Sequence, residues 1–109
     1  MLDAPAPSPL VAWAWSRLRA THGSVRIEEL VSETGFSHRH LVARFRDEIG
    51  VTHKTLARVL RFERSVDLVR RAQTSFAEAA LAAGYYDQAH FNREIRALTG
   101  CAPGVLFGN

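Results

Sequence analysis

The predicted outward face of one helix, over residues 88–99, collects side chains suited to reading DNA bases: Gln88, Ala89, Asn92 and Arg93. Gln and Asn pair bidentately with adenine in the major groove, and Arg pairs with guanine in the same way. A small side chain lets a helix approach the bases closely or touch a thymine methyl group. At about 100° per residue, a helix with Phe91 inward turns this face outward. The pattern therefore predicts a helix surface that contacts DNA.

The stretch that contains this helix occurs twice in the chain. Residues 84–100 read GYYDQAHFNREIRALTG, and residues 35–50 read GFSHRHLVARFRDEIG. The copies align with an offset of 49 before the turn and 50 after it, because the second turn has one extra residue. Glycines, polar capping residues and core positions recur together, which argues against chance. Each copy is therefore expected to build the same local structure.

The first copy, with Leu41 inward, carries a different outward face. Its predicted base-reading residues are Arg39, Val42 and Ala43. Arg39 is the best candidate among them, because Val42 and Ala43 have no side-chain polar atom to pair with a base edge. The predicted DNA phosphate contacts of both copies are Ser37, Arg44, Arg46 and Arg96. The first copy is expected to hold DNA more than to discriminate between sequences.

Apolar spacing predicts seven helical segments and no strand. The segments cover approximately residues 10–20, 27–34, 38–49, 53–71, 76–84, 88–99 and 103–107. Their predicted N-terminal caps include Ser8, Ser37, Thr52, Ser75 and Asp87. In each copy a short helix, a Gly-containing turn and a second helix form the pattern of a helix-turn-helix motif. The predicted fold is thus all-α and homeodomain-like, with two helix-turn-helix subdomains joined by a long central helix.

The chain has 109 residues, of which 47% are hydrophobic and 23% charged, a composition typical of a globular protein. Residues 1–9 hold all but one of the prolines, which predicts a linker or frayed end. The predicted organisation continues with a first helix-turn-helix subdomain at 10–51, a connecting helix at 52–72 and a second subdomain at 73–109.

Basic residues are concentrated in the middle of the chain and are almost all Arg. Between residues 36 and 71 there are eight Arg and one Lys against four acidic residues. The planar guanidinium binds two acceptors at once, which suits phosphate groups and guanine edges. A solvated helix surface would give the same charge pattern, so charge alone favours nucleic acid only slightly.

The chain resembles the AraC/XylS family of bacterial transcription regulators over about residues 10–107. The resemblance is most specific in AEAALAAGYYDQAHFNREIRALTGCAPGVLF and extends to LRFERSVDLV in the middle helix. It implies two helix-turn-helix subdomains whose recognition helices, about 38–49 and 88–99, enter adjacent major-groove faces of an operator. It also implies RNA polymerase as a partner and an effector-binding or dimerisation domain elsewhere in a longer chain. The sequence is then expected to be the C-terminal part of that chain, and a small stand-alone family member is the alternative.

Several residues depart from the family pattern, among them Arg26, which stands where a Ser or Thr cap would be expected. Val42 is apolar where a polar reader is common, and Ala43 stands where the family often has Arg or another polar residue. Glu94 adds an anionic group near the phosphates, and Ile95 replaces the usual Phe. The departures at Val42 and Ala43 favour Arg39 as the base contact of the first recognition helix.

Two other classes of function are alternatives to DNA binding. A helical protein-interaction module could use the same fold without DNA. An enzyme is not expected, because no catalytic constellation is present. Five His and one Cys lack ligand spacing for a metal, so neither a metal site nor a cofactor is predicted. No apolar run reaches the roughly 20 residues of a membrane helix, and the expected location is the cytoplasm, in association with the nucleoid.

Overall fold

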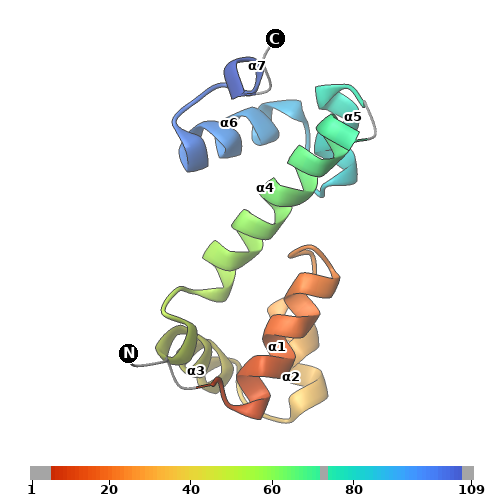
Figure 1. The fold of residues 1–109 in the computed structure, drawn as a ribbon. Coiled ribbons are helices and arrows are strands. Elements are labelled where there is room, and N and C mark those ends of the chain that lie inside the picture. The colour runs from red at the N-terminus through yellow and green to blue at the C-terminus, as the bar shows by residue number, and fades with distance from the viewer. Residues whose placement is uncertain (1–5, 72–73, 107–109) are drawn as a thin grey trace. The chain divides into compact units, whose positions relative to one another are not determined.

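The structure, a computed structural model, describes residues 6–71 and 74–106, and within these ranges it contains seven α-helices and no strand. The helices are α1 (Pro9–Ala20), α2 (Ile27–Thr34), α3 (His38–Ile49), α4 (His53–Arg71), α5 (Phe76–Ala82), α6 (Gln88–Thr99) and α7 (Pro103–Leu106) (Figure 1). The predicted all-α fold with two helix-turn-helix motifs is confirmed.

Five of the described helices begin after a polar residue that the sequence marks as a cap, whereas α2 follows Arg26, which makes no side-chain capping bond. Ser8 Oγ accepts the Val11 N–H, and a side-chain oxygen likewise caps α3, α4 and α6 from Ser37, Thr52 and Asp87. Each bond satisfies one of the donors that a helix leaves unpaired in its first turn. Because such caps fix where a helix starts, they also fix which of its faces turns inward.

Ser75 and Glu78 at the start of α5 have the spacing of a capping box, but their hydrogen bonds differ from the usual geometry. Ser75 Oγ accepts the Glu78 N–H at 3.1 Å and donates to Glu78 Oε1, also at 3.1 Å. In a full capping box the carboxylate would accept the backbone N–H of the cap residue instead. The Glu78 carboxylate is thus held by the same hydroxyl that caps the helix.

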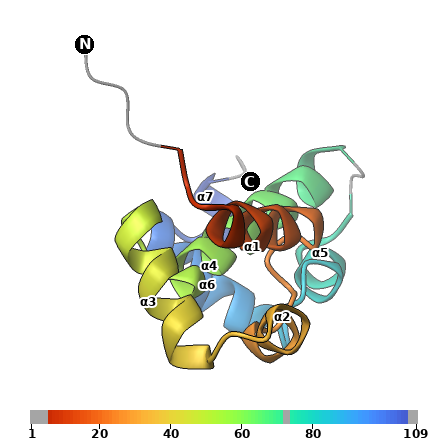
Figure 2. The same cartoon turned by 90° about the horizontal axis from the view of Figure 1, so that it is seen from below.

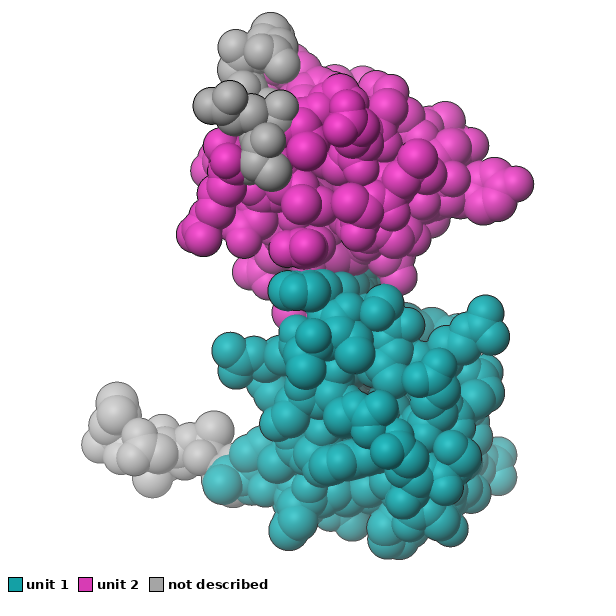
Figure 3. Space-filling model, turned by 90° about the vertical axis from the view of Figure 1, so that its right-hand side faces the viewer, with its two compact units in different colours: residues 1–58 teal, residues 59–109 magenta. Residues whose placement is uncertain are grey.

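The chain divides into two compact units, residues 1–58 and 59–109, called unit 1 and unit 2 below (Figure 3). In unit 1, α3 contacts both α1 and α2 (Figure 2). The buried side chains of unit 1 come from all three helices: Val11, Ala14, Leu18, Leu30, Leu41 and Phe45. Since Leu41 and Phe45 lie on one side of α3, the opposite side of that helix is exposed.

Unit 2 has a core of its own. Its buried cluster consists of Ala80, Ala83, Tyr85, Phe91 and Ile95. Side chains of α4, α5 and α7 pack against this cluster: Phe62, Leu68, Phe76 and Leu106. Phe91 and Ile95 anchor α6 in the way that Leu41 and Phe45 anchor α3, so the repeat predicted from the sequence has matching core positions.

Parts of several sequence predictions fall outside the described residues. These parts are positions 1–5 of the predicted linker, residue 72 of the predicted connecting helix, and residues 73 and 107–109 of the predicted second subdomain and last turn. The predicted division at residues 51/52 and 72/73 stays a proposal.

Candidate nucleic-acid interface

The turn between α2 and α3 is short and ends α2 with a left-handed glycine. Gly35 has φ +76°, and its N–H donates to the Val31 carbonyl at 3.2 Å. L-residues rarely adopt this conformation, so Gly is favoured there. Phe36 and the cap residue Ser37 follow directly. The Phe36 ring is 47% exposed and stacks on His40 with ring centroids 4.8 Å apart.

In the second motif the stretch from the turn glycine to the start of α6, residues 84–87, is one residue longer than its counterpart, residues 35–37. Here Gly84 has φ +97°, and the Tyr85 N–H donates to the Ala80 carbonyl at 2.9 Å. Tyr85 is buried, with 3% of its surface exposed, whereas the extra residue Tyr86 is 86% exposed. The Tyr86 N–H donates to Nδ1 of His90 at 3.1 Å. The inserted residue therefore lies at the start of α6 and is held there by the helix itself.

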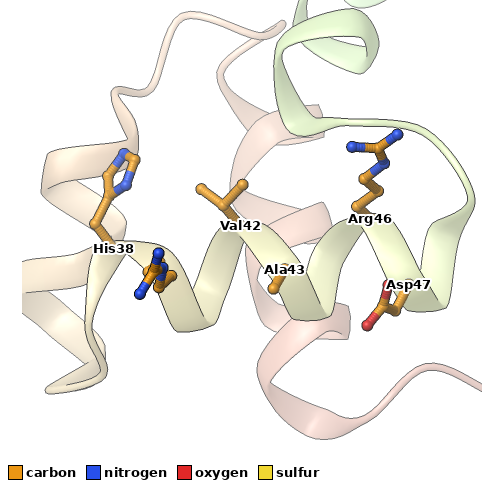
Figure 4. Close-up of a pocket in the computed structure, with 6 residues that line it drawn as sticks. His38, Val42, Ala43, Arg46 and Asp47 are labelled. Atoms are coloured by element: carbon orange, nitrogen blue, oxygen red, sulfur yellow. The ribbon is translucent and has the colours of Figure 1, made fainter.

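The outward side of α3 forms a shallow open groove of about 590 Å³. It is lined by His38, Arg39, Val42, Ala43, Arg46 and Asp47 (Figure 4). Val42 and Arg46 project toward one edge of the helix and Ala43 and Asp47 toward the other (Figure 4). The structure thus brings together Arg39, Val42, Ala43 and Arg46, four of the proposed contact residues, and adds His38 and Asp47, which the sequence prediction omitted.

The outward side of α6 is more polar. Its predicted contact residues are all exposed, namely Gln88, Ala89, Asn92, Arg93 and Arg96. On the opposite side, Phe91 and Ile95 are fully buried. The burial of these two anchors holds the helix so that the amide and guanidinium groups face solvent, where they can pair with a base edge.

Arg44 lies outside the groove and is paired within unit 1. Its Nε and Nη2 donate to Oε2 of Glu48 at 2.8 and 2.6 Å. The same carboxylate accepts from Ser8, through the backbone N–H to Oε1 at 2.5 Å and through the hydroxyl to Oε2 at 3.0 Å. The hydrogen bond from the Ser8 backbone, followed by the bonds from Arg44 and the Ser8 hydroxyl, lowers the pKa of the Glu48 carboxyl. Glu48 is therefore held as the anion.

A second ionisable group near the groove is His53, the first residue of α4. Burial lowers the pKa of His53, and the charges of Lys54 and His38 lower it further, while Glu28 raises it. His38, one of the groups that lower the His53 pKa, also lines the groove.

Asp47, His38 and Glu48 are the residues that sequence reasoning missed at this surface. Asp47 stands four residues after Ala43, and Glu48 stands four residues after Arg44, so helical spacing alone could have placed both. No such signal existed for the bond to Ser8, which is 40 residues away in sequence.

Within residues 6–71 and 74–106 no group of three or more His, Cys, Asp or Glu is arranged to hold a metal ion. Among the helices described, none combines the length and apolarity needed to cross a membrane.

The fold and the two outward helix faces define a helical protein with paired helix-turn-helix motifs. A family model described as a helix-turn-helix domain matches residues 30–109. YkgA of Escherichia coli K12, described as an HTH-type transcriptional regulator, is 30% identical over 89 residues, covering 82% of this chain and 37% of that protein. The F1 operon positive regulatory protein of Yersinia pestis is 32% identical over 79 residues, which cover 72% of this chain and 26% of that protein. The chain thus spans well under half the length of these curated relatives.

Solved structures show the same fold. The C-terminal domain of AraT, a response regulator from Geobacillus stearothermophilus, superposes with a TM-score of 0.82 at 20% identity, covering 93% of this chain and 85% of that one. A probable AraC family transcriptional regulator from Rhodopseudomonas palustris CGA009 gives a TM-score of 0.75 at 26% identity, covering 88% and 92%. The chain belongs to the AraC/XylS family, as the sequence resemblance implied. This is a family of DNA-binding transcription regulators and not of enzymes.

Proposed function

We propose that the chain binds double-stranded DNA in a sequence-specific manner and thereby regulates transcription, with α3 and α6 as recognition helices. The observation that carries this proposal is the outward face of α6, where Gln88, Asn92 and Arg93 are exposed opposite two buried anchors. These are the side-chain types that read adenine and guanine in the major groove. Recognition helices of paired motifs fit adjacent major-groove faces, about 34 Å apart.

The two recognition helices have different proposed roles. On α6, Ala89 completes the base-reading set by allowing close approach. On α3, Arg39 is the main proposed reader, with Val42 and Ala43 in apolar contact, because the groove that these residues line contains no amide side chain. The first motif therefore positions the protein on DNA, and the second supplies most of the discrimination.

Phosphate contacts are proposed at the ends of the same helices. Arg46 and Arg96 are exposed in the last turns of α3 and α6. The Ser37 hydroxyl accepts the His40 N–H and can still donate its own hydrogen to a phosphate oxygen. Arg44 also belongs to the predicted set, but its guanidinium is bonded to Glu48, so it is not counted among the proposed contacts of the parent chain. Such contacts fix register without reading sequence.

Substituting one residue of each kind tests this division. Arg93→Ala should cost about 1–3 kcal/mol in binding to the preferred site and relax the preference at the base that it reads. Arg46→Ala should weaken binding to all sequences and reduce the salt slope by about one. The preferred site comes from selection of bound DNA from a random pool, and affinities are then measured across salt concentrations. If Arg93→Ala binds this site as tightly as the parent, the base-reading role is wrong.

The alternative, a helical protein-interaction module, gives a different result in the same assay. A DNA-binding domain should be retained on mixed genomic DNA at low salt and released steeply as salt rises, because phosphate contacts displace counterions. Absence of retention at low salt would favour the interaction module. A selected site with two half-sites about one turn apart would support engagement of both helices, and a single half-site would assign reading to one helix.

The regulators that this chain resembles lead us to propose three further properties. They are contact with RNA polymerase, association with the nucleoid and connection to an effector-binding or dimerisation domain. The last is consistent with the share of the curated relatives that the chain covers, 37% of YkgA and 26% of the Yersinia protein.

A further inference from the structure

The hydrogen bonds around Glu48 join two segments that are far apart in sequence. Ser8 caps α1, and Glu48 lies in the last turn of α3. The carboxylate accepts two bonds from Ser8 and two from Arg44. Its side chain is only 19% exposed, while that of Arg44 is 46% exposed. The pair is thus anchored on its acidic side and open to solvent on its basic side.

This arrangement occurs in the first motif alone. In the aligned second copy, Glu94 takes the place of Arg44, and Leu98 takes the place of Glu48. At these positions α6 therefore has neither an Arg that could bind phosphate nor an acidic residue in place of Glu48. The Arg and acid pair is a property of the motif that the proposed function assigns to holding DNA.

A DNA phosphate that approached this part of α3 would compete with the Glu48 carboxylate for the Arg44 guanidinium. Bidentate binding of Arg to a carboxylate and to a phosphate uses the same planar set of N–H donors. An exposed ion pair contributes little by itself, because solvent screens it and the side chains must be ordered. Glu48 differs from such a pair because Ser8 already orders its carboxylate, so holding Arg44 costs less additional ordering.

We propose that Glu48 is a positioning residue that withholds Arg44 from DNA phosphate and thereby limits sequence-independent binding by the first motif. This inference rests on the proposed DNA-binding function. It concerns Arg44 specifically: Arg46 and Arg39 lie in the groove, whereas Arg44 is bonded to Glu48 away from the lining. The consequence is that one of the three Arg residues of α3 adds nothing to affinity for bulk DNA while Glu48 is intact.

A double-mutant cycle tests the proposal without relying on net charge. Arg44→Gln is made in the parent chain and in a Glu48→Gln background, so the same charge is removed each time. Gln is chosen at position 48 because its carbonyl oxygen can still accept the Ser8 N–H. Binding to mixed-sequence duplex DNA is measured from 50 to 200 mM NaCl, and circular dichroism checks that each variant is folded.

Arg44→Gln should leave the salt slope of the parent unchanged. In the Glu48→Gln background the same substitution should lower the slope by about 0.9, which corresponds to an approximately 3.5-fold change in the affinity ratio between the two salt concentrations. The proposal would be overturned if Arg44→Gln changed the salt slope equally in both backgrounds, either by nothing or by about 0.9 in each. If the parent itself does not bind DNA in a salt-dependent manner, the proposed function fails instead.

Discussion

The two helix-turn-helix motifs place the aromatic residue after the turn glycine in opposite environments. Phe36 is 47% exposed and stacks on His40, whereas its counterpart Tyr85 is 3% exposed and meets Phe91 edge-on at 5.3 Å. The extra residue, Tyr86, makes the second turn longer and carries the exposed aromatic ring there. One added residue thus lets the turn contribute a side chain to the core of unit 2.

The outward faces of the two recognition helices also differ, and α6 is the more polar of the two. In α3 the positions aligned with Asn92 and Arg93 hold Val42 and Ala43, and acidic Asp47 lies in the groove beside them. The buried anchor positions are repeated in both helices, but the polar side chains that suit base reading are found mainly on α6. A duplicated motif can therefore keep its anchors while its surface positions diverge, because the anchors determine folding and the surface determines binding.

The largest expected effect comes from the turn aromatics. Tyr85→Ala should destabilise the chain by about 3–5 kcal/mol, because truncating a buried aromatic leaves a cavity in the core. Phe36→Ala is the matched substitution, and it should cost much less because half of that ring already faces water. Urea unfolding of both variants measures the difference. Equal losses of stability would mean that the two turns support their units in the same way.

A smaller loss of stability is expected when glycines of unit 1 are replaced. In this unit the turn aromatic is exposed, and a close backbone contact is found at Gly23 instead. A Cβ at Gly23 would lie 2.5 Å from the Ala57 carbonyl oxygen, and φ is +83°. At Gly35 φ is +76°, but a Cβ would meet nothing within 4 Å. The left-handed conformation alone costs about 1–2 kcal/mol for Ala, so Gly35→Ala should stay in that range.

Gly23→Ala should cost clearly more than Gly35→Ala, because α4 must move away from the loop after α1. Thermal unfolding of the two variants measures this difference, with the shared conformational cost cancelling. Similar midpoints for both would show that the loop relaxes freely and that the close approach to Ala57 adds little to unit 1.

Local features of the fold were predictable from the sequence. Helix starts follow from caps such as Ser37 and Asp87, whose hydroxyl or carboxylate acts within three residues. The outward faces of α3 and α6 follow from the spacing of buried anchors, since a helix has a fixed rotation per residue. Both signals are contained in a short stretch of chain, so no knowledge of tertiary packing was needed.

Other features depend on packing between distant segments. Alignment treats Phe36 and Tyr85 as equivalent, and only the three-dimensional path of the longer turn shows that one is exposed and the other buried. The bond between Ser8 and Glu48 joins residues 40 apart, and no local pattern predicts it. Arg44 has the charge expected of a phosphate contact, but the anchored acid that holds it is not apparent from the sequence.

The smallest expected effect is a difference in acid sensitivity between the units. The Glu48 pKa is lowered in the folded chain, so its stabilising contribution is present above about pH 4.5 and is lost as pH falls through the folded value. The His53 pKa is also lowered, so the unfolded chain takes up a proton more readily and stability falls as pH drops below about 6.5. Both groups belong to unit 1, and both changes act in the same direction.

Unit 1 should therefore lose protection before unit 2 on acidification. Amide hydrogen exchange, corrected for the intrinsic rates at each pH, should show α1 and α3 opening more readily at pH 4 than at pH 7, with a smaller change in α6. The expected change in stability is modest because Glu48 and His53 are both partly exposed, so water solvates each side chain in either protonation state. Protection lost first in α6 would place the acid-sensitive step in unit 2, where neither group lies. In the Glu48→Gln variant the part of the change near pH 4 should disappear while the part near pH 6 remains, since only His53 still titrates there.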